Sequence, residues 1–196
     1  MKNTLFSILM ILVATLFAAV IPTEAEGAVY ADTVRLHILA ESDSTEDQML
    51  KLMLRDTVLA EFGQELSQAT NADGARDMLG GRLSEIEDFC EGKIREHGYD
   101  YAVSVTLDEE WYDTREYDGF TLPSGTYTSL RIVIGSGSGQ NWWCVMFPPL
   151  CLDAAVEDAP SDDAVKKYSD EEITLISGNG YNAKFKILEL IADAFS

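Results

Sequence analysis

Histidine, cysteine and basic side chains are scarce in this sequence, and that scarcity excludes several classes of site. The 196 residues include two histidines, three cysteines and 14 lysines and arginines. No His-Glu-x-x-His, paired Cys-x-x-Cys, calcium-loop or phosphate-loop spacing occurs. We therefore expect no metal site, no cofactor and no nucleotide-binding loop.

The shortage of basic residues leaves a large excess of acid. The chain carries 34 aspartates and glutamates, and its formal net charge is -20. Such a chain repels nucleic-acid phosphates and anionic lipid headgroups, whereas it attracts a cation or a basic protein surface. We exclude nucleic acid as a partner. The alternative explanation of the acidic charge is that it only keeps the domain soluble and identifies no partner. The composition is otherwise that of a globular domain, with 46% hydrophobic residues.

The N-terminal segment has the layout of a secretory signal peptide. Lys2 supplies a positive charge, residues 5–21 are almost wholly apolar, and Pro22 ends that run. Ala25 and Ala31 are small residues at which signal peptidase cleavage fits the small-x-small rule. The pattern predicts export across a membrane.

We expect residues 1–31 to be removed on export and residues 32–196 to form a single extracytoplasmic domain. The apolar run is near the lower length limit for a spanning helix, so an uncleaved anchor is the alternative. No other stretch of the sequence is long and apolar enough to span a bilayer.

Apolar periodicity predicts two helices and a short strand in the first half of the domain. Val34, Leu36 and Ile38 alternate with polar residues, as in a strand with one buried face. Ser44, with Asp47 three residues on, has the spacing of a capping box and starts a helix. The expected helices cover residues 50–62 and 83–94, with a break at 71–74 and a C-terminal cap at 97–98.

The second half reads as β structure followed by a closing helix. We expect strands at 101–107, 130–134, 142–147 and 173–176, a turn at 122–125, a hairpin loop at 135–139, an acidic loop at 153–163 and an amphipathic helix at 183–195. The fold class is therefore α+β: an N-terminal strand and two helices, an antiparallel sheet and a C-terminal helix in one compact domain.

The cysteines suggest one disulfide. Cys144 and Cys151 bracket six residues that contain two prolines. Export would place them in an oxidising compartment, so we predict that they pair, with two free thiols as the alternative that geometry decides. Cys90 lies on a helical apolar stripe and is expected to be a small buried core residue.

A thiol hydrolase would need a cysteine, a histidine base and an orienting acid in contact. His37 and His97 are the two available bases, and neither is near a cysteine in sequence. No nucleophile elbow occurs. We expect no catalytic residues, and keep a secreted thiol- or metal-dependent hydrolase acting on envelope material as the alternative.

Two segments remain unexplained by core packing alone. Residues 35–47 gather charges of both signs around a strand-to-helix turn, whose ordinary explanation is a capped helix with weak surface ion pairs. Residues 141–151 contain adjacent tryptophans, which point to opposite faces of a strand and so are both core only if both faces are covered. An exposed tryptophan there would be an interface anchor.

These segments, in this order behind a signal peptide, resemble the stage II sporulation protein R family of endospore-forming bacteria. The resemblance covers most of residues 33–153 and is strongest at 141–151. Glu41 stands where the family pattern suggests Asn, and residues 154–181 are not diagnostic. The matching residues are Arg35-Leu36-His37, Ser42-Asp43-Ser44, Asp47-Gln48, Leu50-Lys51, Arg55-Asp56, Leu122 to Tyr127, Leu130-Arg131, Ile134-Gly135, Gly139 and Asn141 to Cys151.

The resemblance implies a messenger. Proteins of this family are made in the forespore and secreted across its membrane into the intermembrane space. There they activate a membrane-bound aspartic protease, which processes the precursor of an early mother-cell sigma factor. The implied partner is the extracytoplasmic part of that protease, with no small-molecule substrate. The candidate partner-binding residues are Arg35, His37, Asp43, Asp47, Trp142 and Trp143.

Overall fold

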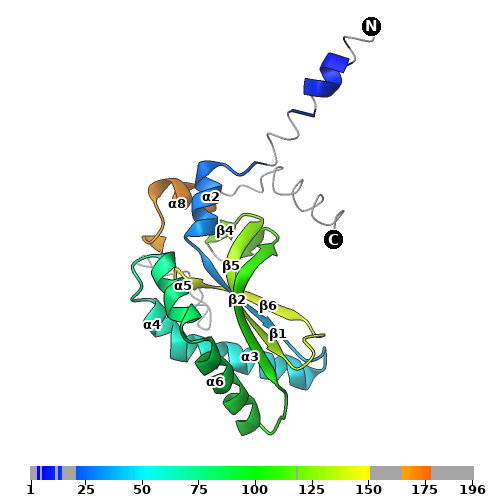
Figure 1. Cartoon of the computed structure of the whole chain (residues 1–196), viewed down its shortest axis with the longest axis vertical. Coiled ribbons are helices and arrows are strands. Elements are labelled where there is room, and N and C mark those ends of the chain that lie inside the picture. The colour runs from blue at the N-terminus through cyan, green and yellow to red at the C-terminus, as the bar shows by residue number, and fades with distance from the viewer. Residues whose placement is uncertain are drawn as a thin grey trace.

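A four-stranded sheet with helices on one face organises the molecule (Figure 1). The computed structural model of the chain describes residues 4, 6–11, 13, 14, 21–117, 119–150 and 165–177. Their elements are α2 (Glu24–Ala31), β1 (Val34–Leu39), α3 (Thr45–Val58), the π-helical turn η1 (Leu59–Gly63), α4 (Gln64–Leu66), α5 (Ala72–Gly80), α6 (Leu83–Glu96), β2 (Val103–Tyr112), β3 (Arg115–Tyr117), β4 (Phe120–Leu122), β5 (Gly125–Ile134), β6 (Asn141–Phe147) and α8 (Asp170–Ser177).

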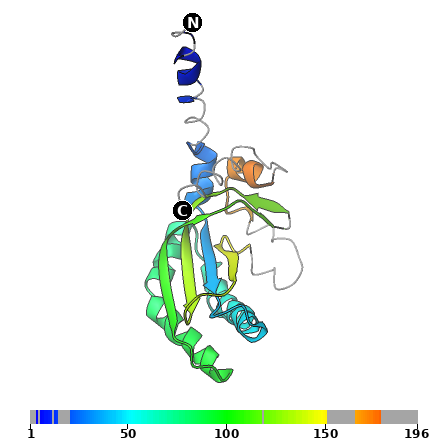
Figure 2. The same ribbon diagram turned by 90° about the vertical axis from the view of Figure 1, so that its right-hand side faces the viewer.

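The sheet has the order β2-β5-β1-β6 and is mixed. β1 pairs parallel with β5 and antiparallel with β6, while β2 pairs antiparallel with β5. Figure 2 looks onto the sheet and shows the strands in this order from left to right, coloured green, yellow-green, blue and yellow. β3 and β4 form a separate two-stranded hairpin. The α+β class is confirmed, and the mainly antiparallel sheet contains one parallel pair.

The loop at 135–139 is not the hairpin that its position between two strands predicted. β5 and β6 are not neighbours, because β1 lies between them. The loop instead crosses the end of β1, where Gly139 N donates to Ala40 O at 2.9 Å. A Cβ at Gly139 would collide with the Ser42 carbonyl, so a glycine permits this approach. Strands adjacent in sequence usually pair, and only the long-range insertion of β1 overrides that rule here.

The helices cover one face of the sheet. Leu36 and Ile38 of β1 and Leu130 and Ile132 of β5 are fully buried and alternate along their strands. The Nε of Arg76, on α5, donates to Thr128 at 2.9 Å on this same face of β5. Burial of a whole leucine or isoleucine side chain stabilises a fold by roughly 1.5–3 kcal/mol. The strand expected at Val34 to Ile38 is confirmed, but the prediction that only one of its faces is buried is wrong, because all six residues of β1 are buried.

The helix starts follow their capping residues, with two corrections. The side chain of Ser44 accepts a hydrogen bond from Asp47 N at 3.1 Å, so the predicted cap is confirmed. The carboxylate of Asp47 instead accepts from Ser42 Oγ at 2.5 Å, so the second half of the capping box is missing. Asn71 was expected to mark a break, yet its side chain accepts from Gly74 N at 2.9 Å and starts the additional helix α5.

Residues 173–176 are helical, so the strand predicted there is wrong. Ser169 and Glu172 form reciprocal hydrogen bonds at the start of α8: Ser169 N donates to Glu172 Oε2 at 2.8 Å, and Glu172 N donates to Ser169 Oγ at 3.4 Å. This is a capping box. A short apolar run looks alike in strands and buried helices, and the cap decides between them here. The expected acidic loop and the helix at 183–195 lie outside the described residues.

Helix α2 belongs to the folded domain. Thr23 and Glu26 form a capping box at its start. Val29 is fully buried, and Tyr30 donates from its hydroxyl to Ser124 O at 2.9 Å. The Tyr30 ring lies so close to Gly125 that a Cβ there would be 2.5 Å from it. The boundary expected at residue 31 therefore falls at the end of a packed helix.

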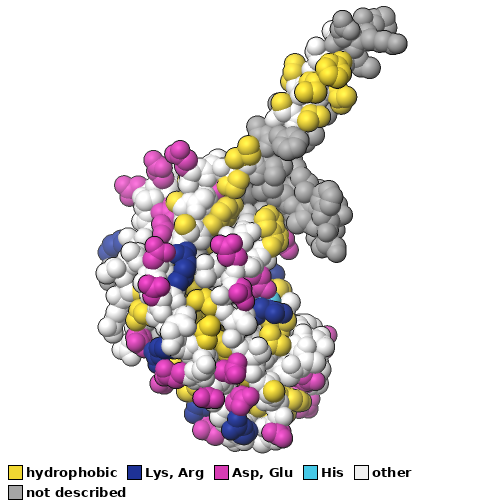
Figure 3. Space-filling model, viewed as in Figure 1, with side chains coloured by type: hydrophobic (Ala, Val, Ile, Leu, Met, Phe, Trp, Pro, Cys, Tyr) yellow, Lys and Arg dark blue, Asp and Glu magenta, His cyan; other side chains and the backbone are white. Residues whose placement is uncertain are grey.

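Among the residues that the structure describes, no helix has the length and apolar character needed to cross a membrane. The apolar side chains of the described N-terminal residues are exposed, as the yellow patches at the top of Figure 3 show.

Cys90 is buried in the core, as predicted, and Cys144 is buried in β6. Cys151 lies outside the described residues, so its pairing with Cys144 stays a prediction. Burial, with the charge of Glu87 adding to it, raises the pKa of the Cys90 thiol to about 12. Because the thiolate is the reactive form, Cys90 should be inert in the folded protein.

We expect iodoacetamide at pH 8 to leave the folded, unreduced protein unlabelled at Cys90. In denaturant without reductant, one label per chain is expected, because pairing of the other two cysteines would protect them. Mass spectrometry counts the labels. Three labels in denaturant would show that Cys144 and Cys151 are not paired, and rapid native labelling of Cys90 would contradict its burial.

Candidate functional site

The sheet separates the six candidate binding residues into three places. Arg35, His37 and Trp143 share the face of the sheet opposite the helices. Trp142 points to the helical face, where the Arg55 guanidinium lies 4.3 Å from its ring centroid. Successive side chains of a strand alternate between faces, which explains why the two tryptophans separate. Asp43 and Asp47 lie beyond the end of β1, in the loop to α3 and in its first turn.

The two aspartates hold loops together. Asp43 Oδ1 accepts from Gln140 N at 2.7 Å, which ties the β1–α3 loop to the loop before β6. The hydrogen bond from Ser42 holds the pKa of the Asp47 carboxyl below its ordinary value. Lys51 is buried and donates to Gln140 O at 2.8 Å. These contacts give the charged turn a structural role within the domain.

The face opposite the helices is polar, and we call it the polar face. Its residues are Arg35 and His37 of β1, Asp108, Glu110 and Tyr112 of β2, Ser129 and Arg131 of β5 and Trp143 of β6, together with Arg115 and Tyr117 of the β3–β4 hairpin. Polar residues at alternate strand positions would ordinarily be solvated, yet Arg35 and His37 are buried here.

Arg35 lies among aromatic rings. Its guanidinium carbon is 4.0 Å from the ring centroid of Tyr112 and 5.1 Å from that of Tyr127. Its Nη2 donates to the hydroxyl of Tyr117 at 2.5 Å. Cation–π contacts stabilise a desolvated arginine by about 2 kcal/mol or more, so the rings offset part of the cost of burying this charge.

His37 joins the arginine region to an acid and to Trp143. Its Nδ1 lies 2.9 Å and 3.0 Å from the two carboxylate oxygens of Glu110. The Trp143 ring stacks on the imidazole with 5.4 Å between centroids, and the Arg115 guanidinium lies 4.2 Å from the same indole. Arg131 Nε is 3.8 Å from Glu110. The site is therefore a cation–aromatic cluster around one carboxylate.

The Glu110 carboxyl is stabilised in its charged form. Burial acts to raise its pKa, but the hydrogen bond and charge of His37, with hydrogen bonds from Ser129 and Tyr112, outweigh burial and lower the pKa below its ordinary value. A folded-state pKa below the unfolded one adds stability above the unfolded pKa. That stability is lost as the pH falls through the folded pKa.

Glu110→Gln should therefore flatten the acid side of the stability profile. The wild-type protein is expected to lose stability more steeply than the variant as the pH falls below about 4.3, the ordinary pKa of a glutamate, and through the lower folded-state pKa. Urea unfolding midpoints measured across that range test this. Glu109→Gln, an exposed neighbour on the other face of β2, is the matched control. Parallel profiles for wild type and Glu110→Gln would contradict the assignment.

Sequence reasoning missed Glu110, Arg115, Arg131 and Tyr112 as members of this site. The strand expected at 101–107 stops short of Glu110 and Tyr112, whereas β2 continues to Tyr112. Arg131 is aligned with His37 by the parallel β1–β5 register, which no local pattern encodes. The apolar alternation stops at Leu107, because three acidic residues precede Trp111 and Tyr112, so it gave no signal that the strand continues.

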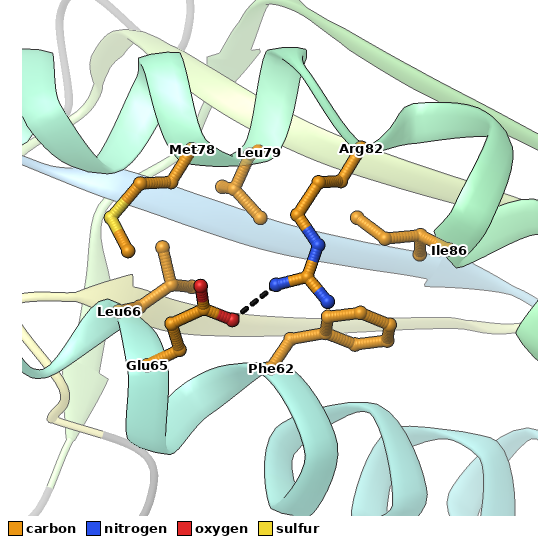
Figure 4. Close-up of a pocket in the computed structure, with 7 residues that line it drawn as sticks. All are labelled: Phe62, Glu65, Leu66, Met78, Leu79, Arg82 and Ile86. Carbon is orange, nitrogen blue, oxygen red and sulfur yellow. Dashed lines mark hydrogen bonds and ion pairs between the residues drawn. The ribbon is translucent and has the colours of Figure 1, made fainter.

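A small apolar cavity lies elsewhere, between η1, α4, α5 and α6 (Figure 4). It has a volume of about 10 Å³ and is lined by Phe62, Glu65, Leu66, Met78, Leu79, Arg82 and Ile86. That volume holds at most one water molecule. Arg82 and Glu65 form an ion pair beside it. The cavity is a packing defect between helices and offers no ligand site.

Among the described residues, no group of three histidine, cysteine, aspartate or glutamate side chains could hold a metal ion.

A family model for stage II sporulation protein R matches residues 30–157. The chain belongs to the stage II sporulation protein R family. That match spans β1 to β6 and so contains the whole polar face.

The stage II sporulation protein R of Bacillus subtilis (strain 168) is similar to this chain. The two are 33% identical over 182 residues, which cover 83% of this chain and 81% of that protein. No solved structure matches the chain. The family membership gives this protein a role in sporulation, and the predicted resemblance is confirmed.

Proposed function

We propose that this family member is a signalling protein, secreted from the forespore into the intermembrane space. It acts by activating a membrane-bound aspartic protease through that enzyme's extracytoplasmic part. The protease then processes the precursor of an early mother-cell sigma factor. Membership of the sporulation family supports the setting, and the N-terminal apolar segment supports export.

The observation that carries the binding role is Trp143 on the polar face. It is half-buried, with His37 stacked on it and Arg115 near its ring. Tryptophan and arginine are the residues that most often dominate binding energy at protein interfaces. Because rigid packing already holds the indole, little entropy is lost when a partner covers it.

The activity is then a difference in binding energy between two states of the protease, and needs no chemistry by this chain. The His37–Glu110 pair orients an imidazole as a catalytic base would require. Within the described part of the chain, however, His37 Nε2 has no hydrogen-bond partner, so no hydroxyl or thiol is in place to be activated. The hydrolase alternative therefore lacks a nucleophile at this site.

Co-expression tests the proposal. The full chain, the protease and the sigma-factor precursor are produced together in a host that lacks sporulation genes, and precursor cleavage is scored. Cleavage that requires this chain supports activation. A protease that cleaves equally well without it, or a purified chain that hydrolyses envelope material by itself, would overturn the proposal.

A further inference from the structure

Arg35 is a buried cation without a counter-ion. Its side chain is fully buried, and its Nε and Nη1 have no hydrogen-bond partner. Across residues 21–117, 119–150 and 165–177, no carboxylate forms an ion pair with it; Tyr117 and two further tyrosine rings are its neighbours. Buried arginines are ordinarily paired with acids, because an unpaired charge in a protein interior is costly.

The imidazole of His37, on the same face of β1, also lacks a hydrogen-bond partner at one nitrogen. His37 is 5% exposed, and its Nε2 has no hydrogen-bond partner in the described structure. Both Arg35 and His37 pack against the Tyr112 ring. Arg35 and His37 each have one partner, but three of their buried nitrogens, on one face of β1, have none. Buried polar atoms are ordinarily hydrogen-bonded, so this group of nitrogens indicates a missing ligand.

The charge of the surroundings indicates what that ligand is. Three arginines, Arg35, Arg115 and Arg131, lie on the polar face, together with two acids, Glu110 and the exposed Asp108. A positive balance is unusual in a chain of net charge -20, and on the face shown in Figure 3 acidic side chains are more prominent than basic ones. An anionic partner group is therefore favoured here, although the molecule as a whole repels anions.

We propose that the polar face binds a carboxylate side chain carried by an acidic, extended segment of the protein partner. Arg35 Nε and Nη1 donate to that carboxylate, and Trp143 with Arg115 contacts the segment beside it. Charge-assisted hydrogen bonds from arginine to a carboxylate are among the strongest in proteins. The inference rests on the proposed function, because it names the chemistry of the partner at that site.

Access to Arg35 requires the β3–β4 hairpin to shift. The hairpin covers the guanidinium through Tyr117, and its paired strands are three residues long each. Figure 2 shows it standing over the polar side of the sheet, near its upper end. As the hairpin opens, the partner's carboxylate binds the Arg35 guanidinium, either in place of the Tyr117 hydroxyl or beside it.

Arg35→Met is the decisive variant, with Arg95→Met as its matched control. Arg95 is exposed on α6, so the control makes the same chemical change far from the polar face. Methionine has a similar volume and removes the unpaired charge, so the melting temperature of Arg35→Met should equal or exceed that of wild type. A large fall in melting temperature would show that the arginine serves the fold.

Binding is measured with N-acetyl-pentaglutamate amide as the probe, and the corresponding pentaglutamine peptide as the neutral control. Wild type and Arg95→Met should bind the glutamate peptide at least about tenfold more tightly than Arg35→Met does, as expected for one charge-assisted hydrogen bond. NMR of the Arg35 Nε–H group in the wild-type protein gives a readout independent of any variant. A resonance that does not move with the glutamate peptide, or moves equally with the glutamine peptide, overturns the proposal.

The co-expression assay separates this inference from the proposed function. If wild type drives precursor cleavage and Arg35→Met does so equally well, the carboxylate site is wrong and the signalling role stands. If wild type drives no cleavage, the signalling role fails irrespective of the peptide result. We expect Arg35→Met to lose cleavage while Arg95→Met retains it.

Discussion

A chain that begins at Asp32 is expected to unfold at a much lower urea concentration than one that begins at Thr23. The shorter chain lacks helix α2, and with it the fully buried Val29 and the Tyr30 ring packed on Tyr127 at 5.0 Å between centroids. Loss of these side chains should lower the free energy of unfolding by about 3–5 kcal/mol, from lost burial and the cavity that remains.

The chain that begins at Thr23 is the matched control, because it removes the apolar segment and keeps the capping box of α2. Tyr30→Ala in that chain should reproduce part of the loss. Equal unfolding midpoints for the two chains would show that α2 adds nothing to the domain.

This prediction bears on the export and cleavage that we propose for this protein. Cleavage after Ala31 would release α2 from the domain, and cleavage after Ala25 would remove its Thr23 cap. We therefore propose that α2 stays attached to the exported domain. The N-terminal sequence of the secreted protein tests this, since a mature chain that starts at residue 32 would contradict it.

Trp142→Ala and Trp143→Ala should have opposite effects, although the two residues are neighbours. Trp142 packs on the helical side beside Arg55, so its removal should cost about 2–4 kcal/mol of stability and leave signalling by the folded fraction unchanged. Trp143 lies on the polar face, so its removal should reduce precursor cleavage at least tenfold, as expected for a binding hot spot of about 2 kcal/mol, and change the melting temperature by only a few degrees.

Urea unfolding and the co-expression assay, run on the same preparations, measure both quantities. Trp142→Phe and Trp143→Phe are the controls that keep an aromatic ring at each position. Full cleavage with Trp143→Ala would remove the polar face from the interface. Loss of cleavage with a stable Trp142→Ala would place the interface on the other side of β6.

Local patterns predicted the elements that depend on nearby residues. The Ser44 cap and the end of α6 at His97, with Gly98 at φ 85°, were expected from their residue types alone. The buried stripe of α6, including Cys90, followed from helical spacing. The strand predicted at 173–176 was wrong because a four-residue apolar run fits either structure until its cap is seen.

The net charge of the chain does not predict the charge of every surface on it. A charge of -20 predicted attraction to a basic partner. The polar face, which gathers Arg35, Arg115 and Arg131, leads to the proposal of an acidic segment at the point of contact. Both statements are compatible, because long-range attraction depends on the whole molecule and is screened by salt, whereas contact chemistry depends on the few groups that meet.

The sequence by itself determined the family, the α+β class, the N-terminal apolar segment and the buried apolar stripe of α6. These depend on composition, motif order and spacing within one segment. Only the tertiary structure decided that β1 lies between β5 and β6, and that His37 therefore meets Glu110 and Trp143. Packing between segments distant in the chain sets the strand order. The same packing buries Arg35 without a counter-ion. No local pattern of residues carries that information.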